Sequence, residues 1–313
     1  MGIRLDTPAD SKTIDWLGTT IRLPIRSADT DGRLSAQLSS LAAGSGNPPH
    51  VHTREVECFY VIDGEVEVSF GAESVMLATG DLVYLPAGLP HQLRVVSETP
   101  AKVLTLLAGG ALERAFVEAS GADPATIKKV FADYGVEIMD AYDGSYRPPG
   151  FEAVTEVDVV VCRSREGAAY WLAGDTYTVL LPGDQTEEQL AVVHFDIPPG
   201  GGPVPHVHTR DFEAFVVLTG EVELYADGAI TTGHPDDVAV LPENIPHCFK
   251  NRTASPAEML AIVTPAGFDR FIAEAGKPAL PGQPAPPVDA AEKARLIATS
   301  PKYGVELRPD IDF

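Results

Sequence analysis

The sequence is poor in several residue types, and each shortage excludes a class of protein. Its 313 residues include only three cysteines, Cys58, Cys162 and Cys248, too few and too scattered for a disulfide framework. No apolar run approaches the ~20 residues that a membrane-spanning helix needs. Lys and Arg number 23 against 45 Asp and Glu, so the net charge is −22. We therefore expect a cytoplasmic protein, kept in a reducing compartment, that binds neither nucleic acid nor an anionic membrane.

Glycine and proline, in contrast, are abundant, with 28 and 27 residues. This composition favours many short strands joined by turns over long helices. Residues 65–70 and 221–225 alternate polar and apolar side chains, as half-buried antiparallel strands do. Short apolar runs at residues 82–85 and 238–241 each stop at a proline. The sequence thus predicts a fold dominated by β-structure.

The second half of the chain repeats the first at an offset of 156 residues. Residues 49–57 read PHVHTREVE, and residues 205–213 read PHVHTRDFE. Two amphipathic helices are predicted after the strands of each half, and each pair leads to a Tyr-Gly-Val-Glu tetrapeptide, at residues 134–137 and 303–306. A Pro-rich linker at residues 277–287 accounts for the longer second tail. We predict two domains, residues 1–147 and 148–313, each ending in a short helical tail.

Six of the eight histidines fall into two equivalent sets. Two histidines separated by one residue share a face of a strand, and a Glu five positions later can join them around one ion. The predicted ligand sets are His50, His52, Glu57 and His91 in the first half, and His206, His208, Glu213 and His247 in the second. Three imidazoles and a carboxylate suit a divalent transition metal, one per domain, among Fe, Mn, Ni, Co, Cu and Zn.

The spacing of these residues resembles the two motifs of the cupin superfamily. The first motif runs from Gly44 through the ligands to Gly64, and the second from Gly80 to His91. The second half repeats both, with Asp236 in place of the second-motif glycine. The chain therefore resembles a bicupin, and within the superfamily it is similar to quercetin 2,3-dioxygenase-like proteins. The resemblance implies two tandem double-stranded β-helix (jelly-roll) barrels and a homodimer.

The same resemblance implies a function, with alternatives left open. It implies a metal-dependent dioxygenase that uses dioxygen on a flavonol-like or other hydroxylated aromatic substrate. Glu57 and Glu213 would be the catalytic residues, each a ligand at rest and a proton acceptor during the reaction. A non-redox cupin isomerase or polyketide cyclase would use a similar ligand set, with the ion as Lewis acid. A non-enzymatic binding cupin is the third class, and retention of all eight ligands argues against its storage form.

Other residues near the motifs are candidates for the pocket. Phe59 and Phe215 lie two positions beyond the glutamates, on the same strand face, so they should point into the barrels or form ordinary barrel core. Tyr84 is a candidate for the same cavity. His194 has no counterpart in the first half, and we expect a surface or supporting role for it. No clear basic residue is evident to hold a small dianion, which argues against oxalate as the substrate.

Overall fold

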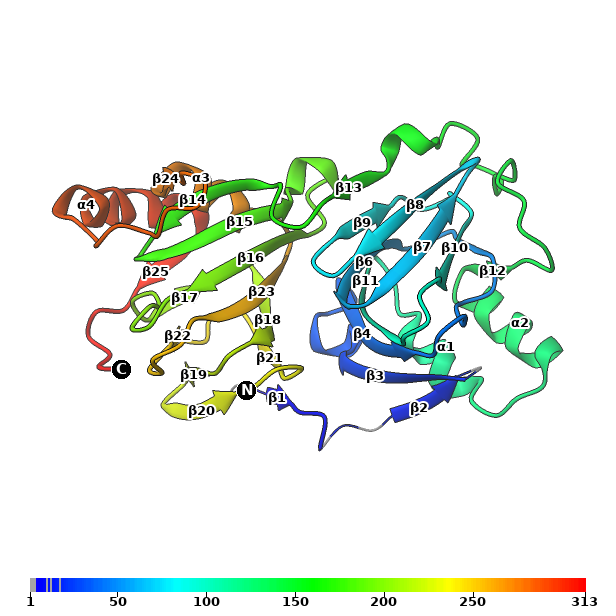
Figure 1. The fold of residues 1–313 in the computed structure, drawn as a ribbon, viewed down its shortest axis with the longest axis horizontal. Coiled ribbons are helices and arrows are strands. Elements are labelled where there is room, and N and C mark those ends of the chain that lie inside the picture. The colour runs from blue at the N-terminus through cyan, green and yellow to red at the C-terminus, as the bar shows by residue number, and fades with distance from the viewer. Residues whose placement is uncertain (1–3, 10, 12, 17) are drawn as a thin grey trace. The chain divides into compact units, whose positions relative to one another are not determined.

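The computed structural model describes residues 4–9, 11, 13–16 and 18–313 (Figure 1). The chain divides into two compact units, residues 11–164 and residues 1–10 with 165–313. We call them the N-terminal and C-terminal units. Both consist mainly of antiparallel strands, which confirms the predicted β-dominated fold.

The N-terminal unit contains two antiparallel sheets. One has seven strands in the order β13-β9-β6-β11-β4-β3-β2, and the other has five in the order β12-β5-β10-β7-β8. The strands are β2 (Thr13–Trp16), β3 (Thr19–Ile25), β4 (Leu34–Leu41), β5 (His50–His52), β6 (Val56–Asp63), β7 (Glu65–Phe70), β8 (Glu73–Ala78), β9 (Leu82–Leu85), β10 (His91–Val95), β11 (Ala101–Ala108), β12 (Val136–Ile138) and β13 (Val160–Cys162).

The C-terminal unit repeats this arrangement. Its sheets have the orders β1-β21-β18-β23-β16-β15-β14-β24 and β20-β19-β22-β17-β25. The strands are β1 (Arg4–Asp6), β14 (Ala168–Leu172), β15 (Asp175–Leu181), β16 (Ala191–Ile197), β17 (His206–His208), β18 (Phe212–Thr219), β19 (Val222–Ala226), β20 (Ala229–Gly233), β21 (Val238–Leu241), β22 (His247–Lys250), β23 (Ala257–Thr264), β24 (Lys277–Pro278) and β25 (Val305–Leu307).

Alternating side chains build the core of each unit. In β7 the even-numbered residues Val66, Val68 and Phe70 are buried, while the odd-numbered residues are more exposed. The buried side chains of both sheets of a unit meet in one hydrophobic cluster, as expected for a jelly roll. The alternation read from the sequence therefore fixes which side chains face the interior of each barrel.

Two short strands, β1 and β13, each pair with a strand that lies in the other half of the sequence. β1 pairs with β21, so residues 4–6 belong to the C-terminal unit. β13 is the counterpart of β1 in the second half, 156 residues later. It pairs with β9 of the N-terminal unit. The connection after residue 147, where we predicted the second domain to begin, thus packs through β13 with the first unit. Each half contributes its leading strand to the sheet of the other half.

A helical tail follows each barrel, at the predicted places. The helices are α1 (Glu113–Glu118), α2 (Pro124–Asp133), α3 (Phe268–Ala275) and α4 (Ala290–Thr299). Asp123 caps α2 by accepting hydrogen bonds from the backbone N–H groups of residues 125 and 126, and Asp289 caps α4 by accepting one from the backbone N–H of Glu292. Aromatic rings of α1 and α2 pack on Trp16 of β2, with centroids 5.1 Å (Phe116) and 5.2 Å (Phe131) away. These contacts seat the first tail beside its barrel.

The turn that carries the predicted departure from the cupin pattern keeps its backbone conformation. Gly80 has φ of +90°, and Asp236, which replaces the glycine in the second half, has φ of +75°. Aspartate tolerates this left-handed region better than most residues with a side chain. The substitution therefore leaves the second motif intact.

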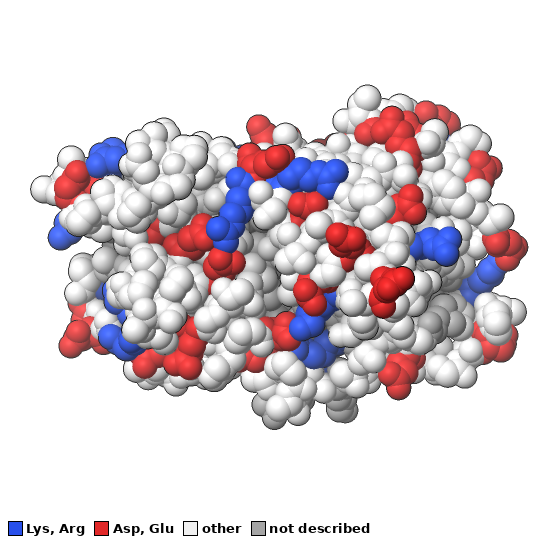
Figure 2. Space-filling view, in the orientation of Figure 1, with Lys and Arg blue, Asp and Glu red and all other residues white. Residues whose placement is uncertain are grey.

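Acidic side chains are spread over the face seen in Figure 2, with fewer Lys and Arg side chains among them. Among the described residues, no helix is long and apolar enough to cross a membrane. All three cysteines are buried as free thiols. Burial raises the pKa of Cys248 to about 12, so this thiol stays protonated and unreactive.

Candidate metal centres and their cavities

Three strands bring the predicted N-terminal ligands together. His50 and His52 stand on one face of β5, Glu57 on β6, and His91 at the start of β10, where it pairs with His50 across the strands. All four side chains are buried, and their ligand atoms lie within 4.8 Å of one another. This spread is close to twice a ~2.0–2.2 Å metal bond, so the four atoms surround one point.

The three imidazoles turn their Nε2 atoms toward one carboxylate oxygen. Oε2 of Glu57 lies 2.7 Å from Nε2 of His91, 3.4 Å from that of His52 and 3.7 Å from that of His50. Nε2 of His52 is buried and has no hydrogen-bond partner. An unsatisfied buried nitrogen is costly, and a bound cation would satisfy it. The donor set therefore fits a metal ion.

The other ring nitrogen of each histidine is held from outside the site. Nδ1 of His50 lies 2.9 Å from the carbonyl of Pro48, and Nδ1 of His91 lies 2.8 Å from that of Leu89. Nδ1 of His52 lies 3.3 Å from Oε2 of Glu55. Because these oxygens accept a hydrogen bond from Nδ1–H, they leave the Nε2 lone pair free for a metal.

Electrostatics in this site also favour a cation. Burial works against charge on His52, but the carboxylates of Glu57 and Glu55 outweigh it and raise its pKa to about 9. Burial and the neighbouring His91 lower the pKa of His50 to about 4. Burial likewise opposes ionisation of Glu57, yet His52 and the hydrogen bonds from the imidazoles hold its pKa well below the ordinary value. The pocket thus keeps an ionised carboxylate facing its imidazoles.

The C-terminal unit reproduces the same centre. His206 and His208 lie on β17, Glu213 on β18 and His247 on β22, all buried and within 4.8 Å at their ligand atoms. Oε2 of Glu213 lies 3.0 Å from Nε2 of His247 and 3.6 Å from that of His208. Nε2 of His208 again has no hydrogen-bond partner. Each unit therefore carries one site suited to a divalent transition metal.

The second site also holds its histidines from outside. Nδ1 of His206 and of His247 face backbone carbonyls at 3.0 and 2.8 Å. Nδ1 of His208 lies 3.4 Å from Oδ2 of Asp211. Glu55 and Asp211 are supporting residues that sequence reasoning missed. Their signal was present, because each carboxylate lies three residues after the second histidine of its motif, at the common offset of 156.

Glu55→Gln is expected to weaken metal binding in the N-terminal site by about 10–100-fold. Glu55 is buried, and its other oxygen accepts from the backbone N–H of Leu112 at 2.8 Å. An amide there would no longer hold the Nδ1 proton of His52 as a carboxylate does. Chelator competition with Zn²⁺ measures the two site affinities.

Asp211→Asn is the matched variant, because it should weaken the C-terminal site and leave the N-terminal site unchanged. Glu65→Gln, at an exposed position of β7, is the control that should change neither. If both sites of all three variants bind Zn²⁺ as tightly as those of the parent protein, Glu55 and Asp211 do not orient their histidines.

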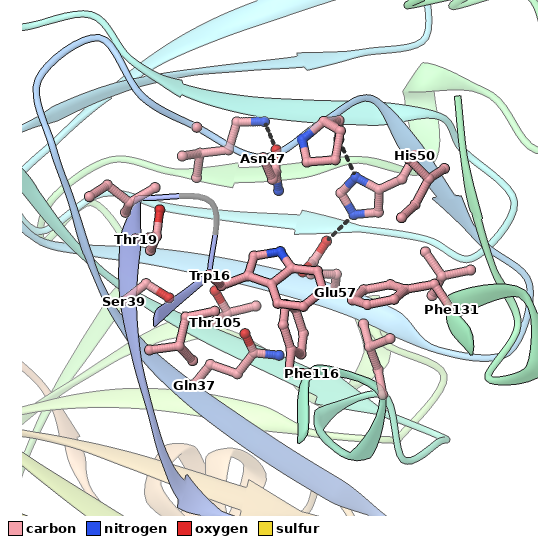
Figure 3. A pocket seen from close by; sticks show the side chains of 18 of the residues that line it. Trp16, Thr19, Gln37, Ser39, Asn47, His50, Glu57, Thr105, Phe116 and Phe131 are labelled. Atoms are coloured by element: carbon pink, nitrogen blue, oxygen red, sulfur yellow. Dashed lines mark hydrogen bonds and ion pairs between the residues drawn. The ribbon is translucent and has the colours of Figure 1, made fainter. Parts of the chain in front are cut away.

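The N-terminal centre opens into a cavity of about 240 Å³ (Figure 3). His50 and Glu57 form part of its wall, and Phe59 lines it as predicted. Trp16 and the rings of Phe116 and Phe131, from the helical tail, close much of the remainder. The cavity is therefore mainly apolar and aromatic, with the metal ligands at one side.

The C-terminal centre opens into a much smaller cavity of about 70 Å³. His206 and Glu213 line it, and Phe215 takes the place predicted for it. Four further phenylalanines, Phe195, Phe249, Phe268 and Phe271, occupy its walls. The ligand sets of the two sites are alike, but the space beside them is not.

Other predicted residues lie away from both cavities. Tyr84 on β9 pairs with Cys58, whereas its neighbours Val83 and Leu85 belong to the barrel core, so Tyr84 faces the opposite side of the sheet. His194 likewise lies between the core residues Val193 and Phe195 on β16 and points away from the cavity.

The contacts of the remaining polar candidates are local. His194 faces two carboxylates, with Nε2 3.5 Å from Glu258 and Nδ1 3.7 Å from Asp196. The His234 side chain is 60% exposed and lies near Glu221 and Asp237. These contacts fit the supporting role expected for His194, and they place His234 at the surface.

Comparison with known proteins finds the same kind of domain in each half of the chain. The cupin domain family matches twice, at residues 37–107 and 193–263. Quercetin 2,3-dioxygenase of Bacillus subtilis (strain 168) is 26% identical over 260 residues, which cover 77% of each protein. Germin-like protein subfamily 2 member 2 of Arabidopsis thaliana is 38% identical over 79 residues, covering 23% of this chain and 36% of the germin-like protein.

Solved structures share this fold over most of the chain. Bacillus subtilis oxalate decarboxylase matches with a TM-score of 0.57 and 19% identity, over 84% of this chain and 76% of the decarboxylase. Lactobacillus farciminis oxalate decarboxylase, in a formate complex, matches with a TM-score of 0.58 and 14% identity, over 84% and 86% of the two chains. At such low identity these likenesses establish the fold alone.

Proposed function

We propose that this chain, a bicupin with a metal-binding site in each of its two cupin domains, is a metal-dependent dioxygenase that acts on a hydroxylated aromatic compound such as a flavonol. The observation that carries the proposal is the N-terminal site. A four-ligand metal centre there opens into an apolar, aromatic-walled cavity of about 240 Å³. The similarity to a quercetin 2,3-dioxygenase over 77% of both chains supports the same class of reaction.

The eight predicted side chains would hold the two metals through Nε2 of each histidine and a carboxylate oxygen of Glu57 or Glu213. A bound ion of this kind supplies Lewis acidity toward a substrate oxygen and, when redox-active, a route for electrons to dioxygen.

Glu57 has two tasks in this proposal. As an ionised carboxylate it completes the ligand set at rest. Because its Oε2 faces the centre of the site, it also lies where the hydroxyl of a substrate would arrive, and it accepts that proton as the hydroxyl becomes an oxyanion. The carbonyl of Leu89, 2.8 Å from Nδ1 of His91, holds that imidazole in place beside the same oxygen.

The walls of the cavity orient the substrate and exclude water. Phe59 from the barrel and Trp16, Phe116 and Phe131 beside the tail present aromatic faces and edges. A flat aromatic substrate packs well against such rings. Excluding water also protects a reactive oxyanion from protonation by solvent.

Oxygen uptake with a panel of flavonols is the experiment that tests this function. Protein loaded separately with Fe, Mn, Co, Ni and Cu should consume oxygen with at least one flavonol and one metal, and metal-free protein should not. Mass spectrometry of the product should show that oxygen atoms from ¹⁸O₂ enter it. Absence of uptake with every metal would reject the oxygenase and favour non-redox chemistry, an isomerase or cyclase, at the same centre.

A further inference from the structure

The two cavities differ because matched positions carry different side chains. Three wall positions of the N-terminal cavity hold Ser39, Leu93 and Leu112; 156 residues later the C-terminal cavity holds Phe195, Phe249 and Phe268. The registers agree, since Ser39 pairs with Val103 in β11 and Phe195 pairs with Met259 in β23. In the C-terminal cavity, phenylalanine rings therefore occupy space that is open in the N-terminal cavity.

Phe195 is the centre of this filling. Its ring lies 5.7 Å from that of Phe249, 5.9 Å from Phe215 and 6.4 Å from Phe268, measured between centroids. Such spacings are those of packed aromatic pairs, and the side chain is only 1% exposed. The rings support one another, so a ligand could enter only by displacing a packed cluster.

The volumes decide what each cavity accepts. An apolar protein cavity of ~150 Å³ holds one benzene molecule, and a water takes ~30 Å³. The C-terminal cavity of about 70 Å³ is smaller than the space of one aromatic ring, whereas the N-terminal cavity of about 240 Å³ exceeds it. An aromatic ligand therefore has room beside only one of the two metal sites.

The N-terminal cavity also has a polar wall that the C-terminal cavity lacks. Gln37 and Thr105 pair across β4 and β11, and Ser39 follows Gln37 on the same face. The three side chains are no more than 8% exposed. Their counterparts in the second half are apolar throughout, namely Val193, Phe195 and Ala261.

This wall, defined as Gln37, Ser39 and Thr105, is available to a ligand. All three side chains line the N-terminal cavity, where a bound ligand would reach them. Figure 3 shows them on one side of the cavity, with His50 on the other side. Buried polar groups are normally satisfied, so three that face a cavity together indicate a ligand with polar groups of its own.

We propose that the chain binds its aromatic substrate in the N-terminal cavity alone, and that Gln37, Ser39 and Thr105 bind the hydroxyl groups of the substrate that lie away from the metal. This inference deepens the proposed function and rests on it for the class of substrate. The C-terminal site then holds its metal without a substrate. The wall selects polyhydroxylated rings, because a ring without those hydroxyls would leave buried polar groups unpaired.

Binding without turnover tests the stoichiometry. Protein loaded with Zn²⁺, which has no redox chemistry, is titrated calorimetrically with quercetin and with catechol. A second readout is Trp16 fluorescence in a Trp171→Phe background, since Trp16 lines the N-terminal cavity. We expect one ligand and two zinc ions per chain. Ser39→Phe, which copies the second half, should weaken both ligands at least tenfold and retain two zinc ions.

The isosteric variants Gln37→Leu and Thr105→Val test the polar wall. Combined, they should weaken quercetin on the order of tenfold and leave 3-hydroxyflavone, which lacks the remote hydroxyls, within twofold. An equal loss for both flavonoids, or no loss for either, would overturn the role of the wall.

The outcomes separate the two proposals. Catechol bound once per chain without any quercetin binding would reject a flavonol substrate but keep the N-terminal cavity as the aromatic site. Two ligands per chain, or one ligand unaffected by Ser39→Phe, would overturn the inference itself. Failure of both probes to bind would overturn it as well.

Discussion

His52→Ala is expected to remove one of the two metal ions and to lower turnover by about 1,000-fold or more. The side chain supplies a buried Nε2 that has no hydrogen-bond partner, and an alanine leaves only three of the four ligands, His50, Glu57 and His91. Loss of the ion removes several kcal/mol of transition-state stabilisation, and each ~1.4 kcal/mol is a factor of ten in rate. Metal analysis and oxygen uptake with the best flavonol measure the two effects.

His208→Ala is the matched variant in the C-terminal site. It should also reduce the metal content from two ions to one, because His208 occupies the equivalent place. If substrate binds only in the N-terminal cavity, the turnover of the His208→Ala variant stays within about twofold of that of the parent protein. Equal losses in the two variants would mean that both centres catalyse the reaction, and a metal content that neither variant lowers would refute the ligand assignment.

The ligands were predictable because they are encoded locally and twice. His50 and His52 need only the period of a strand to share a face, and the copy at residues 206 and 208 removes the ambiguity of a single motif. The match of the two remaining ligands of each half at the same offset, Glu57 with Glu213 and His91 with His247, then indicated which strands meet around each site. The homodimer implied by the resemblance stays a prediction.

The difference between the cavities was harder to predict. Ser39 and Phe195 occupy matched positions, and alternation alone places both on inward faces. Whether a phenylalanine fills the space or lines it depends on the rings around it, and these come from β22 and α3, far along the chain. The exchange of β1 and β13 between the halves was missed for a similar reason, since three-residue strands carry little periodic signal.

Asp175 shows another consequence of packing that the sequence did not indicate. It stands at the start of β15, fully buried, where the first half has Thr19. Its Oδ1 accepts from the backbone N–H of Gly202 at 3.2 Å, and its Oδ2 lies 3.4 Å from the hydroxyl of Tyr177. These two contacts do not compensate for burial, which raises the pKa of Asp175 to about 7.

Asp175→Asn is therefore expected to stabilise the C-terminal unit increasingly as the pH rises from 5 to 8. An unfolded Asp ionises near pH ~3.9, whereas the folded one keeps its proton up to about pH 7. The folded state thus binds more protons in this interval, so raising the pH costs the parent protein stability that an uncharged Asn does not lose. About two pH units at ~1.4 kcal/mol each give a relative gain of about 3 kcal/mol, levelling off above pH 7.

Denaturant unfolding of metal-free protein at pH 5, 6, 7 and 8 measures this gain, followed by Trp171 fluorescence in a Trp16→Phe background so that the C-terminal unit is observed. Asp184→Asn, an exposed carboxylate of the same unit, is the control and should show no such trend. A stability difference between Asp175→Asn and its parent that stays constant from pH 5 to 8 would mean that Asp175 is already ionised in the folded protein at pH 5. Its burial would then be offset by interactions stronger than the contacts to Gly202 and Tyr177.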